Sequence, residues 1–161
     1  MYKFVLVIHN NIGGINMDEN IELLEIVYKN AEMGSFTINK LLKELEDKEN
    51  KIKKLAKEEL DIYEQYKDES EELIKKYDYD LEKNKLTSKI MSSMGISKEV
   101  KSDNSDSSIA HMLTEGITMG IVDMETKIDN YKDVVEKDIL KLAKKFLKFQ
   151  QEEIEKLKEY M

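Results

Sequence analysis

Apolar residues from Met17 onward recur in steps of three and four, the spacing of one face of an α-helix. This pattern predicts a first helix over about 19–46 and, after a polar break near Asp47 and Lys48, a second from Ile52 to Tyr77. The inward stripe of the first helix is Leu24, Tyr28, Ala31, Ser35, Ile38, Leu42 and Leu45. That of the second is Ile52, Leu55, Glu59, Ile62, Tyr66, Leu73 and Tyr77, with Tyr63 beside it. So short a connection makes the two helices antiparallel neighbours.

The second half of the chain repeats this arrangement after a less regular region, about 78–106. Residues 86–96 fit a short helix that ends at Gly95, and 101–108 fit a polar linker rich in turn and cap residues. Ser107 or Ser108 then caps a helix over about 108–130, whose inward positions are Ile109, Met112, Leu113, Gly116, Met119, Gly120 and Ile128. A last helix, about 135–160, places inward Ile139, Leu142, Phe146, Phe149, Glu153, Leu157 and Tyr160. The pattern predicts an all-α, antiparallel four-helix bundle of two hairpins joined by a long crossover, about 78–106.

Residues 1–16 do not share this periodicity. Their apolar run, Phe4 to Ile8, is too short for a signal peptide or a membrane-spanning helix, so we expect neither export nor a membrane anchor. Met17 is followed at once by Asp18, Glu19 and Asn20, which is typical of a helix start. The preferred interpretation is that the functional domain spans 17–161 and that 1–16 are an extension or a start-site artefact. The alternative is a short strand or hydrophobic flap that packs on the bundle.

Composition narrows the class of partner. The chain of 161 residues is long enough for one domain with a sizeable core, and its lack of proline permits long helices. All 26 basic residues are lysines and the net charge is −8, which argues against nucleic-acid binding because arginine forks read bases and phosphates best. The absence of cysteine excludes disulfides and thiolate metal sites and is compatible with the cytoplasm, where we expect the protein.

Three segments resemble small bacterial ferritin-like four-helix-bundle proteins of unknown function. They are Tyr28-Lys29-Asn30-Ala31-Glu32-Met33-Gly34, the stretch His111–Ile121 with its Gly116-x-x-x-Gly120 pair, and Leu142–Leu157. The resemblance covers about residues 19–160 and implies a ferritin-like arrangement of the bundle. It implies fold much more than activity.

The usual di-iron chemistry of the ferritin-like fold rests on two Glu-x-x-His motifs, and this chain contains none. Its two histidines are His9 and His111, and Ser108 stands three residues before the latter. His111 falls in the first turn of a helix, where the helix dipole disfavours a cation, so we expect a neutral surface residue and not a ligand.

Carried over residue by residue, the resemblance assigns four carboxylates to a reduced metal site. Glu59 matches one motif glutamate, with Ile62 in the histidine position. On the last helix Gln150 stands in the glutamate position and Glu153 in the histidine position. The nearest matches on the other two helices are Glu32 and Glu115.

Two functions follow from these observations. The first is a non-catalytic bundle without a cofactor that works through a protein partner or as a homo-oligomer. The alternative is binding, oxidation or storage of Fe or Mn at Glu32, Glu59, Glu115 and Glu153. An unpaired buried carboxylate costs several kcal/mol, so we expect Glu59 to extend to the edge of the bundle and to pair there with a lysine of a neighbouring helix. A cavity is expected near the small residues Ala31 and Gly34, with Asn30, Glu32 and Ser35 beside it.

A basic stripe runs along the last predicted helix: Lys141, Lys144, Lys145 and Lys148. Acidic residues bracket it, so a solvated face with i,i+4 pairs is the simplest interpretation. The alternative is docking against the acidic first helix of the same or another chain, since Asp18 to Asp47 contains eight acids and three lysines.

Overall fold

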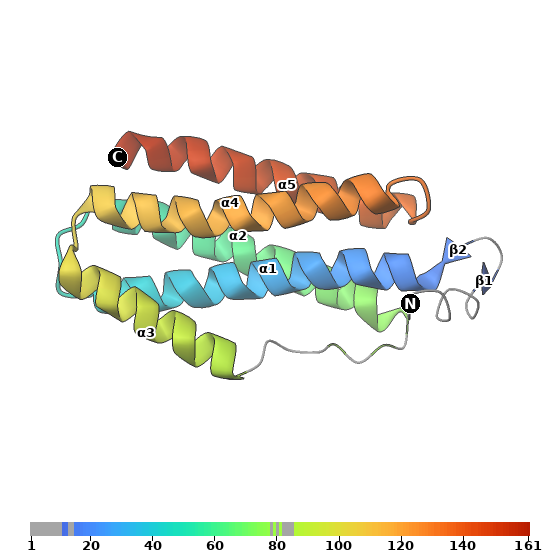
Figure 1. Ribbon diagram of the computed structural model, residues 1–161, viewed down its shortest axis with the longest axis horizontal. Coiled ribbons are helices and arrows are strands. Elements are labelled where there is room, and N and C mark those ends of the chain that lie inside the picture. The colour runs from blue at the N-terminus through green and yellow to red at the C-terminus, as the bar shows by residue number, and fades with distance from the viewer. Residues whose placement is uncertain (1–10, 13–14, 78, 80, 82–85) are drawn as a thin grey trace, which may run out of the picture.

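The chain folds as a bundle of long helices (Figure 1). The computed structural model describes residues 11–12, 15–77, 79, 81 and 86–161. Two short strands, β1 (Asn11–Ile12) and β2 (Ile15–Asn16), pair antiparallel ahead of the bundle. The helices are α1 (Met17–Glu44), α2 (Ile52–Lys75), α3 (Leu86–Ser102), α4 (Asp106–Tyr131) and α5 (Lys137–Leu157), followed by the 3₁₀ turn η1 (Lys158–Tyr160). The predicted helical bundle is confirmed.

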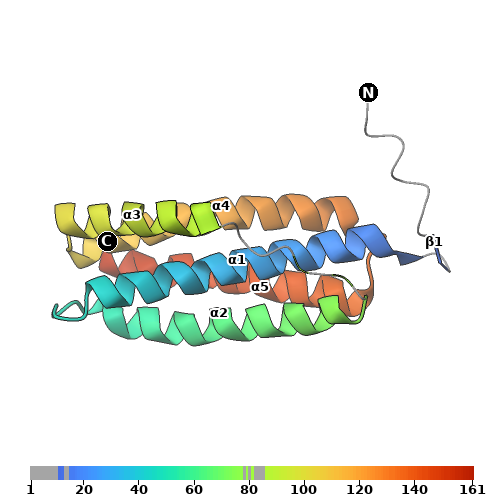
Figure 2. The same ribbon diagram turned by 90° about the horizontal axis from the view of Figure 1, so that it is seen from below.

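Two antiparallel hairpins, α1–α2 and α4–α5, lie side by side in both views (Figures 1 and 2). The amino ends of α2 and α4 meet, because the Asp106 carboxylate accepts hydrogen bonds from the backbone N of Lys51 (3.2 Å) and of Ile52 (3.4 Å). Asn50 Nδ2 donates to the same carboxylate at 2.9 Å. The end of α2 and the start of α4 therefore lie at opposite ends of the bundle, and the chain between them returns along its length.

Much of this crossover is α3, whose end the sequence pattern placed too early, at Gly95. The helix continues to Ser102 because Ile96 and Val100, one turn apart, are buried in the core. Gly95 itself is exposed, and a Cβ at this position would have no described atom within 4 Å, so no close contact requires a glycine here. The next cap is also displaced from its predicted position, since Ser105 caps α4 by accepting a hydrogen bond from Ser108 N.

The described core consists of two clusters of buried residues. The larger contains Leu23, Leu24, Val27, Tyr28, Ala31, Ile38, Ala56, Tyr63, Ile74, Met124, Ile128, Ile139, Leu142, Ala143, Phe146 and Phe149. The smaller contains Leu41, Leu45, Ile52, Leu55, Ile96, Val100, Ile109, Ala110, Leu113, Ile117 and Leu157. Burial differs from the predicted stripes on α2, where Tyr63 is buried while Ile62 and Tyr66 are only partly so, and on α4, where Gly116 and Met119 are exposed. A rotation of each helix by less than one residue about its axis accounts for both.

Asn20 performs a different role from the one its position suggested. It is fully buried, and its Oδ1 accepts a 2.7 Å hydrogen bond from the backbone N of Glu136 at the start of α5. The Glu136 carboxylate in turn accepts a hydrogen bond from the Tyr77 hydroxyl at 2.9 Å. These contacts tie α1 and the end of α2 to the α4–α5 hairpin.

Helix α1 begins at Met17, as the helix-start signature predicts. Residues 1–10, and with them His9 and the predicted strand or flap at Phe4–Ile8, lie outside the described residues. The interpretation of 1–16 as an extension or start-site artefact therefore stays a prediction. Among the described residues, no helix is long and apolar enough to span a bilayer.

Candidate functional site

The two carboxylates of the middle of the bundle, Glu59 on α2 and Glu153 on α5, are each only 2% exposed. The helical period places Glu59 and Tyr63 on the same face of α2, one turn apart. The Tyr63 hydroxyl donates a 2.6 Å hydrogen bond to Oε2 of Glu153. A buried carboxyl–phenol pair thus joins the two hairpins.

Glu59 has a cationic partner, as predicted, but the prediction that it lies at the edge of the bundle is wrong, because the packing of α5 against α2 buries it. The Lys156 ammonium on α5 lies 3.4 Å from Glu59 Oε1, while half of the Lys156 side chain remains exposed. The other carboxylate oxygen of Glu59, Oε2, is buried and has no hydrogen-bond partner among the described residues. The site therefore contains two carboxyl groups and a single lysine that can neutralise one of them.

Burial changes the proton affinity of both carboxyl groups. Desolvation raises the pKa of Glu59, against the opposing effect of the Lys156 charge. Desolvation, reinforced by the Glu59 charge, raises the pKa of Glu153 to about 8, although the hydrogen bond from Tyr63 works in the opposite direction. Glu153 is therefore mainly protonated at neutral pH and can serve as a hydrogen-bond donor or, once ionised, as an anion.

Tyr63 is held in place by aromatic packing and by a glycine. Its ring makes edge contacts with Phe146 and Phe149, whose centroids lie 6.2 and 5.1 Å away. On the opposite side, a Cβ on Gly34 of α1 would lie only 2.5 Å from the Tyr63 ring. Gly34 thus permits the approach of α1 that seats Tyr63 beneath Glu153.

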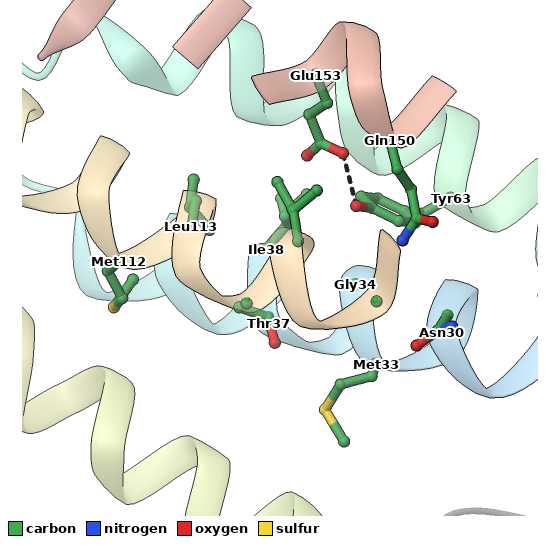
Figure 3. Close-up of a pocket in the computed structure, with 13 residues that line it drawn as sticks. Asn30, Met33, Gly34, Thr37, Ile38, Tyr63, Met112, Leu113, Gln150 and Glu153 are labelled. Atoms are coloured by element: carbon green, nitrogen blue, oxygen red, sulfur yellow. Dashed lines mark hydrogen bonds between the residues drawn. The ribbon is translucent and has the colours of Figure 1, made fainter. Parts of the chain in front are cut away.

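A cavity of about 110 Å³ lies next to this pair, between α1, α4 and α5 (Figure 3). At one end, Tyr63, Gln150 and Glu153 converge from α2 and α5 (Figure 3). The remaining lining is largely apolar or glycine: Met33, Gly34, Ile38, Met112, Leu113, Gly116, Ile117 and Gly120, with Asn30 and Thr37 as the other polar residues. The cavity predicted near Asn30 and Gly34 is confirmed, but Glu32 and Ser35 are not part of its described lining.

The side chain of Gln150 reaches over α4 at a second glycine. A Cβ on Gly120 would lie 2.7 Å from Gln150 Nε2 and 3.5 Å from Asn30 Oδ1. Gln150 is 2% exposed, and its Oε1 has no hydrogen-bond partner in the described part of the chain. Of the Gly116-x-x-x-Gly120 pair, only Gly120 makes such a contact, since no described atom lies within 4 Å of a Cβ on Gly116.

The four carboxylates carried over from the resemblance do not form one cluster. Glu115 is exposed on α4, and Glu32 is half-buried on α1, where its charge helps to raise the pKa of Tyr28. His111 is exposed, with Nδ1 2.7 Å from the Ser107 carbonyl oxygen, which confirms its surface position. Within the part of the chain that the structure describes, no group of three His, Cys, Asp or Glu residues is placed to hold a metal ion.

Tyr63 is the residue of this site whose burial the sequence pattern did not predict. The predicted stripe leaves it on the flank, yet it is buried and bonds to Glu153. The spacing along the chain could have predicted this burial, because Glu59 and Tyr63 are four residues apart and therefore share a helix face.

A second feature lies on the outer surface of α5. Five exposed lysines occupy the segment from 137 to 148 with a single acid, Asp138, among them: Lys137, Lys141, Lys144, Lys145 and Lys148. Lys148 pairs with Glu152 at 3.7 Å, which confirms one predicted i,i+4 pair. In the described chain the other four form no ion pair, so docking on α1 of the same chain is not observed. We call these five residues the lysine stripe.

The outer surface of α2 has the opposite charge. Five exposed acids, which we call the acidic stripe, are Glu58, Asp61, Asp68, Glu69 and Glu72. Within the described residues none of the five forms an ion pair. α2 and α5 are neighbours, since Tyr66 of α2 stacks on Phe149 of α5 at 5.6 Å. The two stripes therefore border one side of the molecule.

No protein family, curated protein or solved structure matches this chain. Its function is inferred from the geometry of the carboxyl pair, the cavity and the two stripes.

Proposed function

We propose that this protein is a non-catalytic helical bundle of ferritin-like arrangement, acting in the cytoplasm, whose function is carried out through association with a second copy of itself. The ferritin-like assignment is supported by the two hairpins and the long crossover that leaves α2 and α4 running in the same direction (Figure 1). The observation that carries the proposal is the lysine stripe, in which four lysines have no ion-pair partner among the described residues, in a chain of net charge −8.

Charge complementarity between the two stripes indicates that the binding partner is a second copy of this chain. The residues from 58 to 72 include eight acids and one lysine, whereas those from 137 to 148 include five lysines and one acid. Because α2 and α5 are antiparallel neighbours, a two-fold axis parallel to them brings each lysine stripe against the acidic stripe of the other copy. Each contact then occurs twice, which doubles the electrostatic attraction.

Analytical ultracentrifugation at low and high salt tests this proposal. The expected result is a dimer at low ionic strength that weakens as salt screens the stripes. Two charge reversals, Lys141→Glu with Lys144→Glu, should give a monomer, and so should Asp68→Lys with Glu72→Lys. Mixing these two variants should restore a heterodimer, because every stripe contact again joins opposite charges. The matched control is Lys98→Glu with Lys101→Glu, which reverses two exposed lysines of α3.

A monomer under all conditions, or a heterodimer that does not form on mixing, would contradict self-association. The lysine stripe could then be tested with an anionic vesicle and a nucleic-acid duplex. Binding to either one by the monomer would replace the proposal with recognition of a polyanion, although the absence of arginine argues against a nucleic acid.

Metal binding at the Glu59–Glu153 pair is the second candidate, favoured by the burial of two carboxyl groups and by Glu59 Oε2, which no described residue pairs. The donor set does not fit a di-iron centre, because Glu32 and Glu115 lie elsewhere and Lys156 already occupies the cationic position beside Glu59. Elemental analysis of protein purified without added metal should therefore find no stoichiometric Fe or Mn. Stoichiometric metal that disappears in Glu59→Ala would overturn the non-catalytic proposal.

A further inference from the structure

The cavity between α1 and α4 contains polar atoms that the described fold leaves without hydrogen-bond partners. Gln150 is 2% exposed and lines the cavity, and its Oε1 accepts no hydrogen bond from a described residue; Nδ2 of Asn30, at the same end, donates none. Buried polar groups are almost always paired, because leaving one unpaired destabilises the fold. Gln150 Oε1 is thus an acceptor available to a molecule inside the cavity.

Three glycines keep this space open. Gly34 and Gly120 are the positions at which a Cβ would collide with Tyr63 and Gln150, so each glycine allows a polar side chain to reach the cavity. Gly116 also lines the cavity, and no described atom lies within 4 Å of where its Cβ would be. The glycines therefore admit polar side chains close to the backbone at Gly34 and Gly120 and leave room at Gly116.

The charges around the cavity favour a cation. Glu153 lines it, and Glu59 lies close enough to raise the pKa of Glu153, whereas Lys156 is the one cation in the described chain that contacts the pair. Among the described residues of the lining there is no lysine or histidine. When both carboxyl groups are ionised, one negative charge remains uncompensated at the end where Gln150 Oε1 is also available to accept.

We propose that this cavity binds a small primary ammonium compound with a short alkyl chain. Its N–H groups would donate to Gln150 Oε1 and to the Glu153 carboxylate, and its alkyl chain would lie among Ile38, Leu113 and Ile117. The volume of about 110 Å³ is somewhat below the ~150 Å³ that accepts a benzene molecule, so roughly four or five non-hydrogen atoms fit. Propylammonium has this size and chemistry.

Binding is coupled to ionisation of Glu153. The titratable groups facing it are Glu59 and Tyr63 from α2 and Lys156 from its own helix α5, while α1 and α4 contribute no titratable side chain to the lining as described. Because burial keeps Glu153 mainly protonated at neutral pH, an ammonium ion must displace its proton into solvent. The affinity should therefore rise with pH up to about 8, the pKa of Glu153, and level off above it.

Isothermal titration calorimetry with propylammonium chloride tests the proposal. The expected result is saturable binding of one molecule per chain, with proton release at pH 7 that shows in buffers of different ionisation enthalpy. 1-Propanol lacks the charge and tetramethylammonium lacks N–H donors, so neither should bind measurably. The lysine-stripe variant Lys141→Glu with Lys144→Glu should bind propylammonium like the parent, which separates this site from self-association.

Variants identify the site. Glu153→Gln keeps the shape but removes the charge, and should weaken binding by roughly tenfold or more. Gln150→Leu should abolish binding while raising the melting temperature, because it removes an unpaired buried carbonyl. Gly116→Leu should block the cavity, whereas Gly95→Leu, an equally open helical glycine outside the lining, should leave binding unchanged.

Absence of saturable propylammonium binding to the folded parent protein would overturn the proposal. Equal binding of 1-propanol or tetramethylammonium, or unchanged binding in Glu153→Gln, would do so as well. A lowered melting temperature in Gln150→Leu together with unchanged binding would show that Gln150 is a structural residue and would likewise contradict the proposed site.

Discussion

The hydroxyl of Tyr63 donates a 2.6 Å hydrogen bond to Glu153 Oε2, across 90 positions of sequence. Tyr63 belongs to the first hairpin and Glu153 to the second, so this one bond joins them inside the core. A hydrogen bond from a neutral donor to a buried carboxyl group is strong when the carboxyl is ionised, and this one lowers the pKa of Glu153 against the larger effect of burial.

Stability should depend on pH through Glu153. Its pKa is raised from 4.5 to about 8 in the folded chain, so the native state binds more protons than the unfolded state in that interval. The contribution to the free energy of unfolding is complete below about pH 4.5 and is lost as pH rises to about 8, a decrease of a few kcal/mol. Urea titrations from pH 5 to 9 measure it. Glu153→Gln should flatten this dependence, and an unchanged slope in that variant would assign the effect to other groups.

Removing the Tyr63 hydroxyl should destabilise the bundle and raise the pKa of Glu153 further. Tyr63→Phe leaves a buried carboxyl group without its donor, at a cost of about 1–3 kcal/mol in the free energy of unfolding. In the double variant Tyr63→Phe with Glu153→Leu, both partners become apolar and much of the loss should be recovered. A double-mutant cycle by chemical denaturation gives the coupling energy. Strictly additive effects would show that the hydrogen bond between Tyr63 and Glu153 does not contribute to the free energy of unfolding.

Two glycines should respond in opposite directions to alanine. Gly34→Ala places a Cβ 2.5 Å from the Tyr63 ring, and this overpacking should cost about 1–3 kcal/mol of stability. Gly95→Ala lies in open space within α3 and should stabilise by about 0.5–1 kcal/mol, because alanine favours a helix. Thermal unfolding of the matched pair tests both. Equal effects on stability would show that the contact between α1 and the Tyr63 ring does not require a glycine at position 34.

Deletion of residues 1–16 should leave the bundle folded. Neither core cluster, as described, includes a residue before Leu23. The melting temperature should therefore change by less than about 5 °C. Differential scanning calorimetry of the chain beginning at Met17 measures this change. A larger decrease would show that the segment Phe4–Ile8 packs on the core.

The sequence by itself was sufficient for the helices and for three of the buried polar residues inside them, Ser35, Glu59 and Glu153. Helical periodicity is local, so it predicted α1, α2, α4 and α5 to within a few residues, and it placed Glu59 and Glu153 on inward stripes. The cost of burying an unpaired carboxylate similarly predicted the cationic partner that Glu59 finds in Lys156. α3 was predicted only in part, because the burial of Ile96 and Val100 that extends it past Gly95 depends on contacts with other helices.

Only the tertiary structure decided which of these residues meet. A stripe shows which residues share a helix face, but the rotation of that face about the helix axis depends on the packing of neighbouring helices. This rotation buries Tyr63 in place of Ile62, exposes Met119, and leaves Glu115 on the surface. It also sets how closely Tyr63 and Gln150 approach the backbone at Gly34 and Gly120, and hence the size of the cavity. The carboxyl–phenol pair and the cavity arise from contacts between helices far apart in sequence, which no local pattern specifies.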